Sequence, residues 1–102
     1  LTVRGNEVTV SYSFYDCSFS LDDIQSAELL DELPDDNFSR ENGGDTEKLL
    51  VGHFKGDKTG DVMLFLYRKE QPLIRIDLPG QTVFLNSDVE GRTEEWYQVL
   101  IG

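Results

Sequence analysis

Three apolar runs in the second half of the chain form the clearest pattern in the sequence. They lie at Leu49–Phe54, Val62–Tyr67 and Leu73–Asn86, and turns that contain Gly or Pro separate them. The third run is divided by Pro79-Gly80, a pair that suits the two central positions of a type II turn. Strands joined by such short turns predict an antiparallel meander.

The central run and the end of the chain predict how this sheet is covered. Both faces of Val62–Tyr67 are apolar, so we expect a central strand that is covered on each side. A helix is expected over residues 93–101, where Trp96 and Leu100 stand one turn apart. Thr93 is expected to cap this helix. The apolar side of the helix would supply the cover.

Alternating residues predict a hairpin at the start of the chain. Apolar side chains fall at every second position, the period of a strand with one buried face: Val8, Val10, Tyr12 and Phe14. Gly5-Asn6 tolerates the positive φ of a tight turn, so Glu7–Phe14 is expected to pair with Leu1–Arg4. A second turn is expected at Asp16–Ser18.

The stretch after this hairpin is less regular. Ser20 could cap a single helical turn, with Asp23 three residues further on. Ile24–Leu33 has the propensity of a helix, and its alternation as a strand is poor, so both structures remain open. Pro34–Glu47 contains a Gly pair and many acidic residues, and is expected to be an exposed, mobile loop.

Length and charge narrow the class of protein. The 102 residues suffice for one domain, 1–102, with a single core. The net charge of −11 repels nucleic acid and anionic lipid unless basic residues cluster, and only Arg68 and Lys69 are adjacent. No apolar run approaches the roughly 20 residues that cross a bilayer. Because the chain begins at Leu1 and its one methionine is Met63, we expect a piece excised from a longer protein.

No combination of residues in the sequence predicts catalysis. Cys17 and His53 are the only cysteine and histidine, and nucleophilic catalysis would need them together. We expect Cys17 to be a half-buried strand residue and His53 an ordinary strand residue. Asp35, Asp36 and Asp45 offer oxygen ligands for a weak cation site, but the spacing of an EF-hand is absent. No enzyme activity, metal or cofactor is therefore predicted.

Several short segments resemble the bacterial pleckstrin-homology-like domain family. The similar segments extend over nearly the whole chain and include Phe19–Ile24, Glu28–Pro34, Gly43-Gly44, Val51–Phe54, Gly60–Val62, Leu66-Tyr67, Pro72–Ile74 and Thr93–Tyr97. The resemblance implies a mainly β fold: a barrel of about seven antiparallel strands in two near-orthogonal sheets, capped by a C-terminal helix. It also implies that Ala27–Leu33 is a strand. The family supplies no catalytic residues, and its members are often attached to transmembrane helices.

These observations lead us to expect a non-enzymatic interaction or scaffold module. Its partner would be another protein or a second copy, bound through open sheet edges, with Phe38 and Arg40 as candidate contacts. For Phe38 the favoured alternative is that the ring folds back over a small apolar cluster of the domain itself. Segments outside this chain would attach it to a membrane, with the domain on the cytoplasmic side.

Two other functions remain as alternatives. A lipid- or membrane-surface domain is disfavoured by the charge of −11, and Arg4 beside Glu7 makes no phosphate cage, so no phosphoinositide is expected. A small hydrolase would have to use Cys17 and His53.

Overall fold

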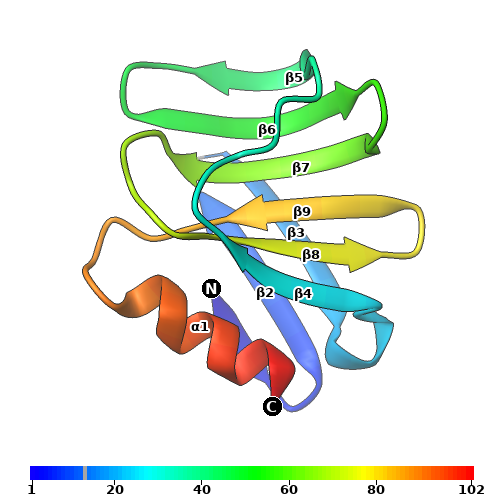
Figure 1. Ribbon diagram of the computed structural model, residues 1–102. Helices are drawn as coiled ribbons and strands as arrows, with labels where there is room; N and C mark the ends of the chain where they lie inside the picture. The colour runs from blue at the N-terminus through cyan, green and yellow to red at the C-terminus, as the bar shows by residue number, and fades with distance from the viewer. Residues whose placement is uncertain (13) are drawn as a thin grey trace.

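A computed structural model describes residues 1–12 and 14–102. Within them the protein is mainly β, with nine strands in two sheets and one C-terminal α-helix (Figure 1). The first sheet, sheet A, has the order β1-β2-β3 and contains β1 (Thr2–Arg4), β2 (Glu7–Tyr12) and β3 (Tyr15–Ser20). The second, sheet B, has the order β4-β8-β9-β7-β6-β5. Its strands are β4 (Ser26–Leu30), β5 (Ser39–Asp45), β6 (Leu49–Gly56), β7 (Gly60–Tyr67), β8 (Leu73–Leu78) and β9 (Gln81–Leu85). The strand number therefore exceeds the seven that the resemblance implies.

Sheet B is not the meander that the sequence predicts. After β7 the chain leaves one strand position empty and forms β8 beyond it. β9 then fills that position between β7 and β8, and it runs parallel to β7. The apolar run Val83–Leu85 of β9 is fully buried, whereas Arg75 and Asp77 of β8 are only partly buried. Placing β9 inside the sheet buries the strand that is apolar on both faces. The central position predicted for Val62–Tyr67 is confirmed, because β7 lies between β6 and β9.

The first hairpin is confirmed, but its far end differs from the prediction. Gly5 has a φ of 58° in the turn between β1 and β2. The residues predicted as a turn, Asp16–Ser18, lie inside β3, where Cys17 pairs with Val10. Phe14 was expected on the buried face but is 97% exposed beyond the end of β2. Ser13, part of the predicted strand, lies outside the described residues.

The ambiguous stretch resolves into a helical turn and a strand. Ser20 caps a short 3₁₀-helix, η1 (Leu21–Asp23), and its Oγ accepts a hydrogen bond from the Asp22 amide at 3.1 Å. The strand that the resemblance implies over Ala27–Leu33 is present as β4. It ends at Leu30, where its pairing with Leu73 of β8 ends.

Seven residues of the predicted loop form a strand. Ser39–Asp45 is β5, the outermost strand of sheet B, and it pairs with β6 along its length. Gly43 lies opposite Gly52, which has a φ of 126°, and a Cβ on either would meet main-chain oxygen of the other strand at 2.3 Å. The two glycines thus permit the backbones of β5 and β6 to approach closely. The strand β5 forms because it pairs with β6, not because its own residues favour a strand.

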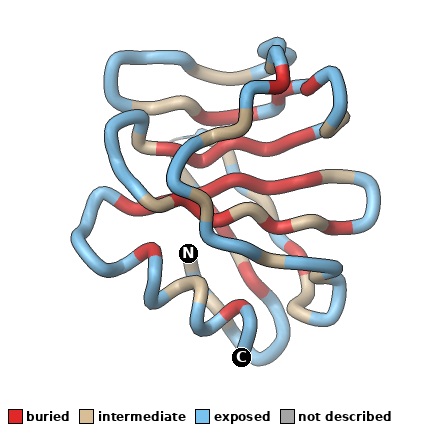
Figure 2. Tube along the Cα trace, viewed as in Figure 1, coloured by how far each residue is buried: buried red, intermediate tan, exposed pale blue. Residues whose placement is uncertain are grey.

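The two faces of sheet B are covered by different parts of the chain (Figures 1 and 2). Sheet A and the helix α1 (Arg92–Ile101) cover one face, and their apolar residues join Met63 and Phe65 of β7 in a single cluster. The other face is crossed by the segment between β4 and β5, which we call the strap (residues 31–38). Leu33 and Phe38 of the strap pack there on a second cluster. The helix therefore covers one face and not the other.

The terminal helix forms as predicted, although its start differs. Trp96 is half-buried and Leu100 is buried against the first cluster. Gly91 is the N-cap, whereas Thr93 is buried in the first turn and its Oγ1 accepts a hydrogen bond from the Ser87 amide at 2.9 Å. Within the described residues, no helix is long and apolar enough to cross a membrane.

Candidate functional site

The structure gives the two predicted partner contacts different surroundings. Phe38 is half-buried, and its ring packs edge-on over Phe84 with the centroids 6.0 Å apart. Arg40 is exposed on β5 opposite Phe54 of β6. Phe38 thus holds the strap on sheet B, and Arg40 lies at the open edge of the sheet.

Asp36 fixes the end of the strap to the turn between β6 and β7. Its carboxylate is buried and accepts hydrogen bonds from the amides of Lys58 at 2.8 Å and Thr59 at 2.7 Å. Its own carbonyl accepts a hydrogen bond from the Asp57 amide at 2.9 Å. Hydrogen bonds from Thr59, and then that from Lys58, hold the pKa of Asp36 below its usual value. Gly56 leaves the space, because a Cβ there would meet the Asp36 carboxylate at 2.3 Å.

A hollow of about 180 Å³ opens between the strap and the loop after β7. Four leucines form its floor, two of them buried and two half-buried: Leu33, Leu50, Leu66 and Leu73. Its rim carries three exposed carboxylates, Asp31, Glu32 and Glu70, and one arginine, Arg68. An apolar floor with charged groups at the rim is typical of a site that takes a single side chain.

A buried asparagine shapes the wall of this hollow. The amide of Asn86 is almost fully buried, and its Oδ1 accepts a hydrogen bond from the Tyr67 amide at 2.7 Å. Its Nδ2 donates to the carbonyls of Tyr67 at 3.1 Å and Glu70 at 3.2 Å. The Tyr12 hydroxyl donates to the Asn86 carbonyl, which ties sheet A to the same point. The loop that carries Glu70 is therefore held from within the protein.

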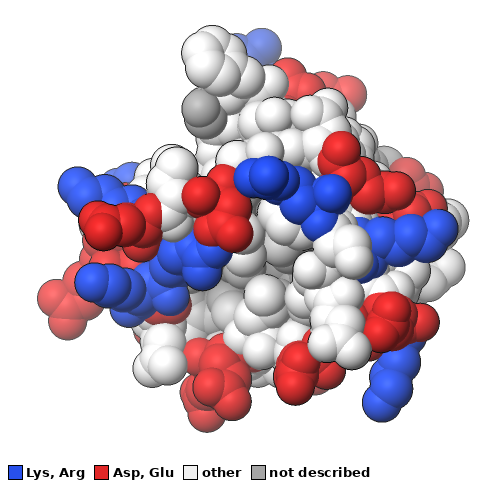
Figure 3. Space-filling model, turned by 90° about the horizontal axis from the view of Figure 1, so that it is seen from above, with Lys and Arg blue, Asp and Glu red and all other residues white. Residues whose placement is uncertain are grey.

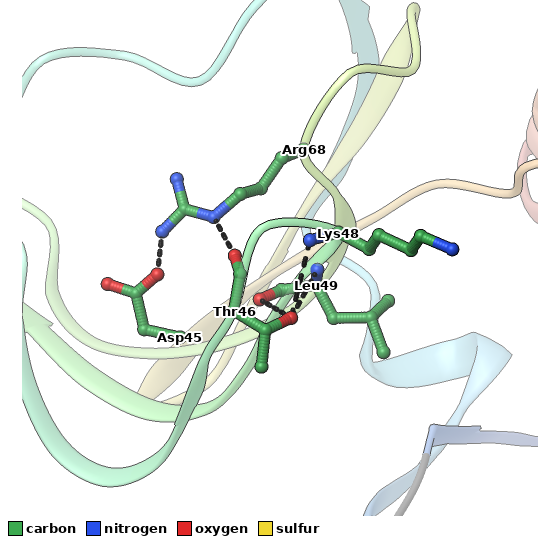
Figure 4. A network of polar contacts seen from close by, with 5 residues as sticks. All are labelled: Asp45, Thr46, Lys48, Leu49 and Arg68. Carbon is green, nitrogen blue, oxygen red and sulfur yellow. Dashed lines mark hydrogen bonds and ion pairs between the residues drawn. The ribbon is translucent and has the colours of Figure 1, made fainter.

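The arginine at the rim is engaged by the protein itself. Arg68 forms an ion pair with Asp45 and donates from Nε to the Thr46 carbonyl at 2.7 Å (Figure 4). Thr46 also organises the turn between β5 and β6, since its Oγ1 accepts from the amides of Lys48 and Leu49. Because Asp45 neutralises Arg68, the three carboxylates dominate the charge at the rim.

A second hollow of about 330 Å³ adjoins the first and shares Tyr67 and Glu70 with it. Lys48 and Lys69 line it together with Glu47 and Asp88. Figure 3, which looks onto the molecule from the β5 side of Figure 1, shows Lys and Arg side chains interspersed with Asp and Glu.

On the face of sheet B that the strap crosses, a group of polar residues forms hydrogen bonds with one another. Asp77 accepts hydrogen bonds from Ser26 at 2.7 Å, Thr82 at 3.0 Å and Arg75 at 3.1 Å. The Arg75 guanidinium also lies 5.7 Å from the Phe84 ring centroid. Burial raises the pKa of Asp77, but these three donors outweigh it and leave the pKa below its usual value. The group links β4, β8 and β9 and needs no external ligand.

The residues considered for catalysis and metal binding lie in separate surroundings. Cys17 accepts a weak hydrogen bond from Gln81 at 3.8 Å, and burial, followed by the charge of the nearby Asp16, raises the pKa of its thiol. His53 is exposed on β6 opposite Met63. Of the acidic candidates for a cation, Asp36 accepts main-chain amides and Asp45 pairs with Arg68. No metal-binding group of three or more His, Cys, Asp or Glu occurs among residues 1–12 and 14–102.

Comparisons with protein-family models, with curated proteins and with solved structures found no match to this chain. Sequence reasoning missed the hollow, because its leucines come from four different elements. The sequence did contain one related signal: β7 is apolar on both faces, which requires that both faces of the sheet be covered.

Proposed function

We propose that this domain is a non-enzymatic interaction module that pairs edge to edge through β5. The observation that supports the proposal is the position of β5: it is the outermost strand of a six-stranded sheet, and its residues are exposed or half-buried. The outer side of an edge strand carries peptide groups that can pair with another strand.

Charge permits a second copy of the chain to approach at this edge, although not at the more acidic parts of the surface. Residues 35–70, which include β5, β6 and β7, contain eight acidic and six basic residues, a net charge of −2. The remaining residues contain twelve acidic and three basic ones, a net charge of −9. Two copies that approach through β5 keep their strongly acidic parts apart, so electrostatic repulsion is smallest in this arrangement.

Features of β5 limit the strength of such pairing. The register shifts between Arg40 and Asn42, and such an irregularity interrupts the ladder and bends the strand. Beyond it, Gly43-Gly44 presents a stretch with no side chains, where another backbone can approach closely. We therefore propose a weak, reversible association rather than an obligate dimer.

The resemblance to the bacterial pleckstrin-homology-like family supports the wider setting of this proposal. In that setting the domain is a scaffold beside a membrane, on its cytoplasmic side, and segments outside this chain attach it. The nine strands and the parallel β7–β9 pair depart from the family's expected seven antiparallel strands. The edge-pairing proposal does not depend on membership of that family.

Sedimentation equilibrium at protein concentrations up to about 0.5 mM tests the proposal, because weak edge contacts are populated there. We expect a monomer–dimer equilibrium that Gly44→Lys abolishes, since a lysine on an edge strand opposes pairing with another strand and adds a positive charge to both copies. A Cβ at Gly44 meets nothing within 4 Å, so the variant should fold. Gln98→Lys, on the exposed face of α1, is the control with the same change of charge. A chain that stays monomeric, or equal dimerisation of both variants, overturns the proposal.

A further inference from the structure

We propose that the hollow between the strap and the loop after β7 is a docking site for a basic segment of a partner protein. The segment would place one bulky apolar side chain on the leucine floor and would carry Lys or Arg on each side of it. This site lies on a face of sheet B rather than at its edge, and the inference does not depend on pairing through β5.

The size and lining of the hollow set the chemistry of the side chain that enters. An apolar cavity of about 150 Å³ is enough to hold benzene, so about 180 Å³ accepts one leucine or phenylalanine side chain. Of the four leucines of the floor, Leu66 and Leu73 are buried and the other two are half-buried. A polar side chain would lose its hydration there without a partner on the floor.

The charge of the rim sets the chemistry of the flanking residues. Asp31, Glu32 and Glu70 are exposed, and none of them forms an ion pair with any part of the chain that the structure describes. The single rim cation, Arg68, is already paired with Asp45. Lysine or arginine beside the apolar side chain would meet three carboxylates, whereas an acidic segment, a phosphate group or a second copy of this −11 chain would be repelled.

The shape of the surface indicates the path of the segment. The second hollow shares Tyr67 and Glu70 with the first, so a chain leaving the leucine floor can continue across these two residues. This second hollow carries two lysines beside Glu47 and Asp88, so its charge is nearly balanced and the acidic contacts of the segment come from the rim of the first hollow. The loop between the hollows is held by Asn86, so the site is formed before the partner arrives.

Titration of the ¹⁵N-labelled domain with an end-blocked pentapeptide tests the inference. The probe has a leucine between two pairs of lysines, and two control peptides replace the leucine by serine or the lysines by glutamates. We expect amide shifts that saturate at Leu33 and at residues 66–71. Because burying a leucine side chain is worth about tenfold or more in affinity, the serine peptide should bind at least about tenfold more weakly. The glutamate peptide should produce no shifts.

A pair of matched variants separates the hollow from the general acidity of the surface. Glu32→Lys with Glu70→Lys reverses two exposed rim charges and should weaken the leucine peptide strongly. Glu94→Lys with Glu95→Lys makes the same change on α1 and should have little effect. Equal weakening by both pairs, equal binding of the leucine and serine peptides, or no shifts at all overturns the inference. Edge pairing through β5 would be untouched by any of these results.

Discussion

At the scale of single residues, the fold depends on a few positions where a single side chain, or its absence, determines whether two distant segments can pack together. Gly52 is the clearest, because its φ of 126° and the closeness of β5 both exclude a side chain. Asp36 is another, since its carboxylate organises a turn more than twenty residues away. Neither role can be seen in the local sequence, because each depends on a segment that is distant along the chain.

Gly52→Ala should lower the free energy of unfolding by at least about 2 kcal/mol. The added Cβ would meet the Asn42 carbonyl at 2.3 Å, in a backbone conformation that alanine rarely adopts. Gly44→Ala is the matched control: nothing lies within 4 Å of its Cβ, and the change should stay within about 0.5 kcal/mol. Urea unfolding measures both values. Equal stability of the two variants would contradict the Gly43–Gly52 pairing.

Asp36 should make stability depend on pH in the acid range. Its folded pKa is depressed, so its contribution is fully present above the unfolded value of about 3.9 and is lost as the pH falls through the folded value. Asp36→Asn should therefore be less stable than the parent chain at neutral pH, and the difference should shrink below about pH 4. Urea midpoints at several pH values measure this. A difference that is constant with pH would show that the carboxylate is not engaged.

At the scale of elements, the strap and β5 shape the two surfaces for which we propose binding. The strap covers one side of sheet B and leaves the leucine-floored hollow beside it. Of the two residues first considered as partner contacts, Phe38 packs on Phe84 and attaches the strap, whereas Arg40 is exposed on β5.

Phe38→Ala and Arg40→Ala should differ sharply in stability. Removing the half-buried Phe38 ring deletes its contact with Phe84 and should cost about 2 kcal/mol or more. Arg40 is exposed and has no ion pair among the described residues, so its loss should change stability by less than about 0.5 kcal/mol. Thermal or urea unfolding compares them. A neutral Phe38→Ala would indicate a ring displayed for a partner.

The elements that sequence reasoning found are those with strong local patterns. The hairpin turn at Gly5, the apolar strand Val62–Tyr67 and the helix with Trp96 all follow from spacing alone. β5 was missed because an exposed edge strand with two glycines has the composition of a loop. The place of β9 was missed because local turns show which strands are consecutive and not which are neighbours. The hollow could not be foreseen, since it depends on that pairing and on the path of the strap.

At the scale of the whole molecule, the uneven distribution of charge is the main constraint on partners. The part that contains β5, β6 and β7 is almost balanced, and the rest is strongly acidic. On the first hairpin Arg4 pairs across the strands with Glu7, which leaves no concentration of basic groups there.

The domain should therefore not bind anionic membranes. In sedimentation with phosphatidylserine vesicles it should stay in the supernatant at low and at physiological salt, as it does with phosphatidylcholine vesicles, because the net charge of −11 is repelled by the lipid headgroups. Binding to the anionic vesicles that decreases with added salt would favour the membrane-surface alternative.

The state of residues 39–45 is the most direct test, because both the open edge and the position of the strap depend on it. In the NMR spectrum of the domain, an ordered β5 predicts a nuclear Overhauser effect between the α protons of Gly43 and Gly52, with extended-strand chemical shifts over Ser39–Asp45. Random-coil shifts over this segment and no contact between the two glycines would contradict the strand and the edge pairing built on it.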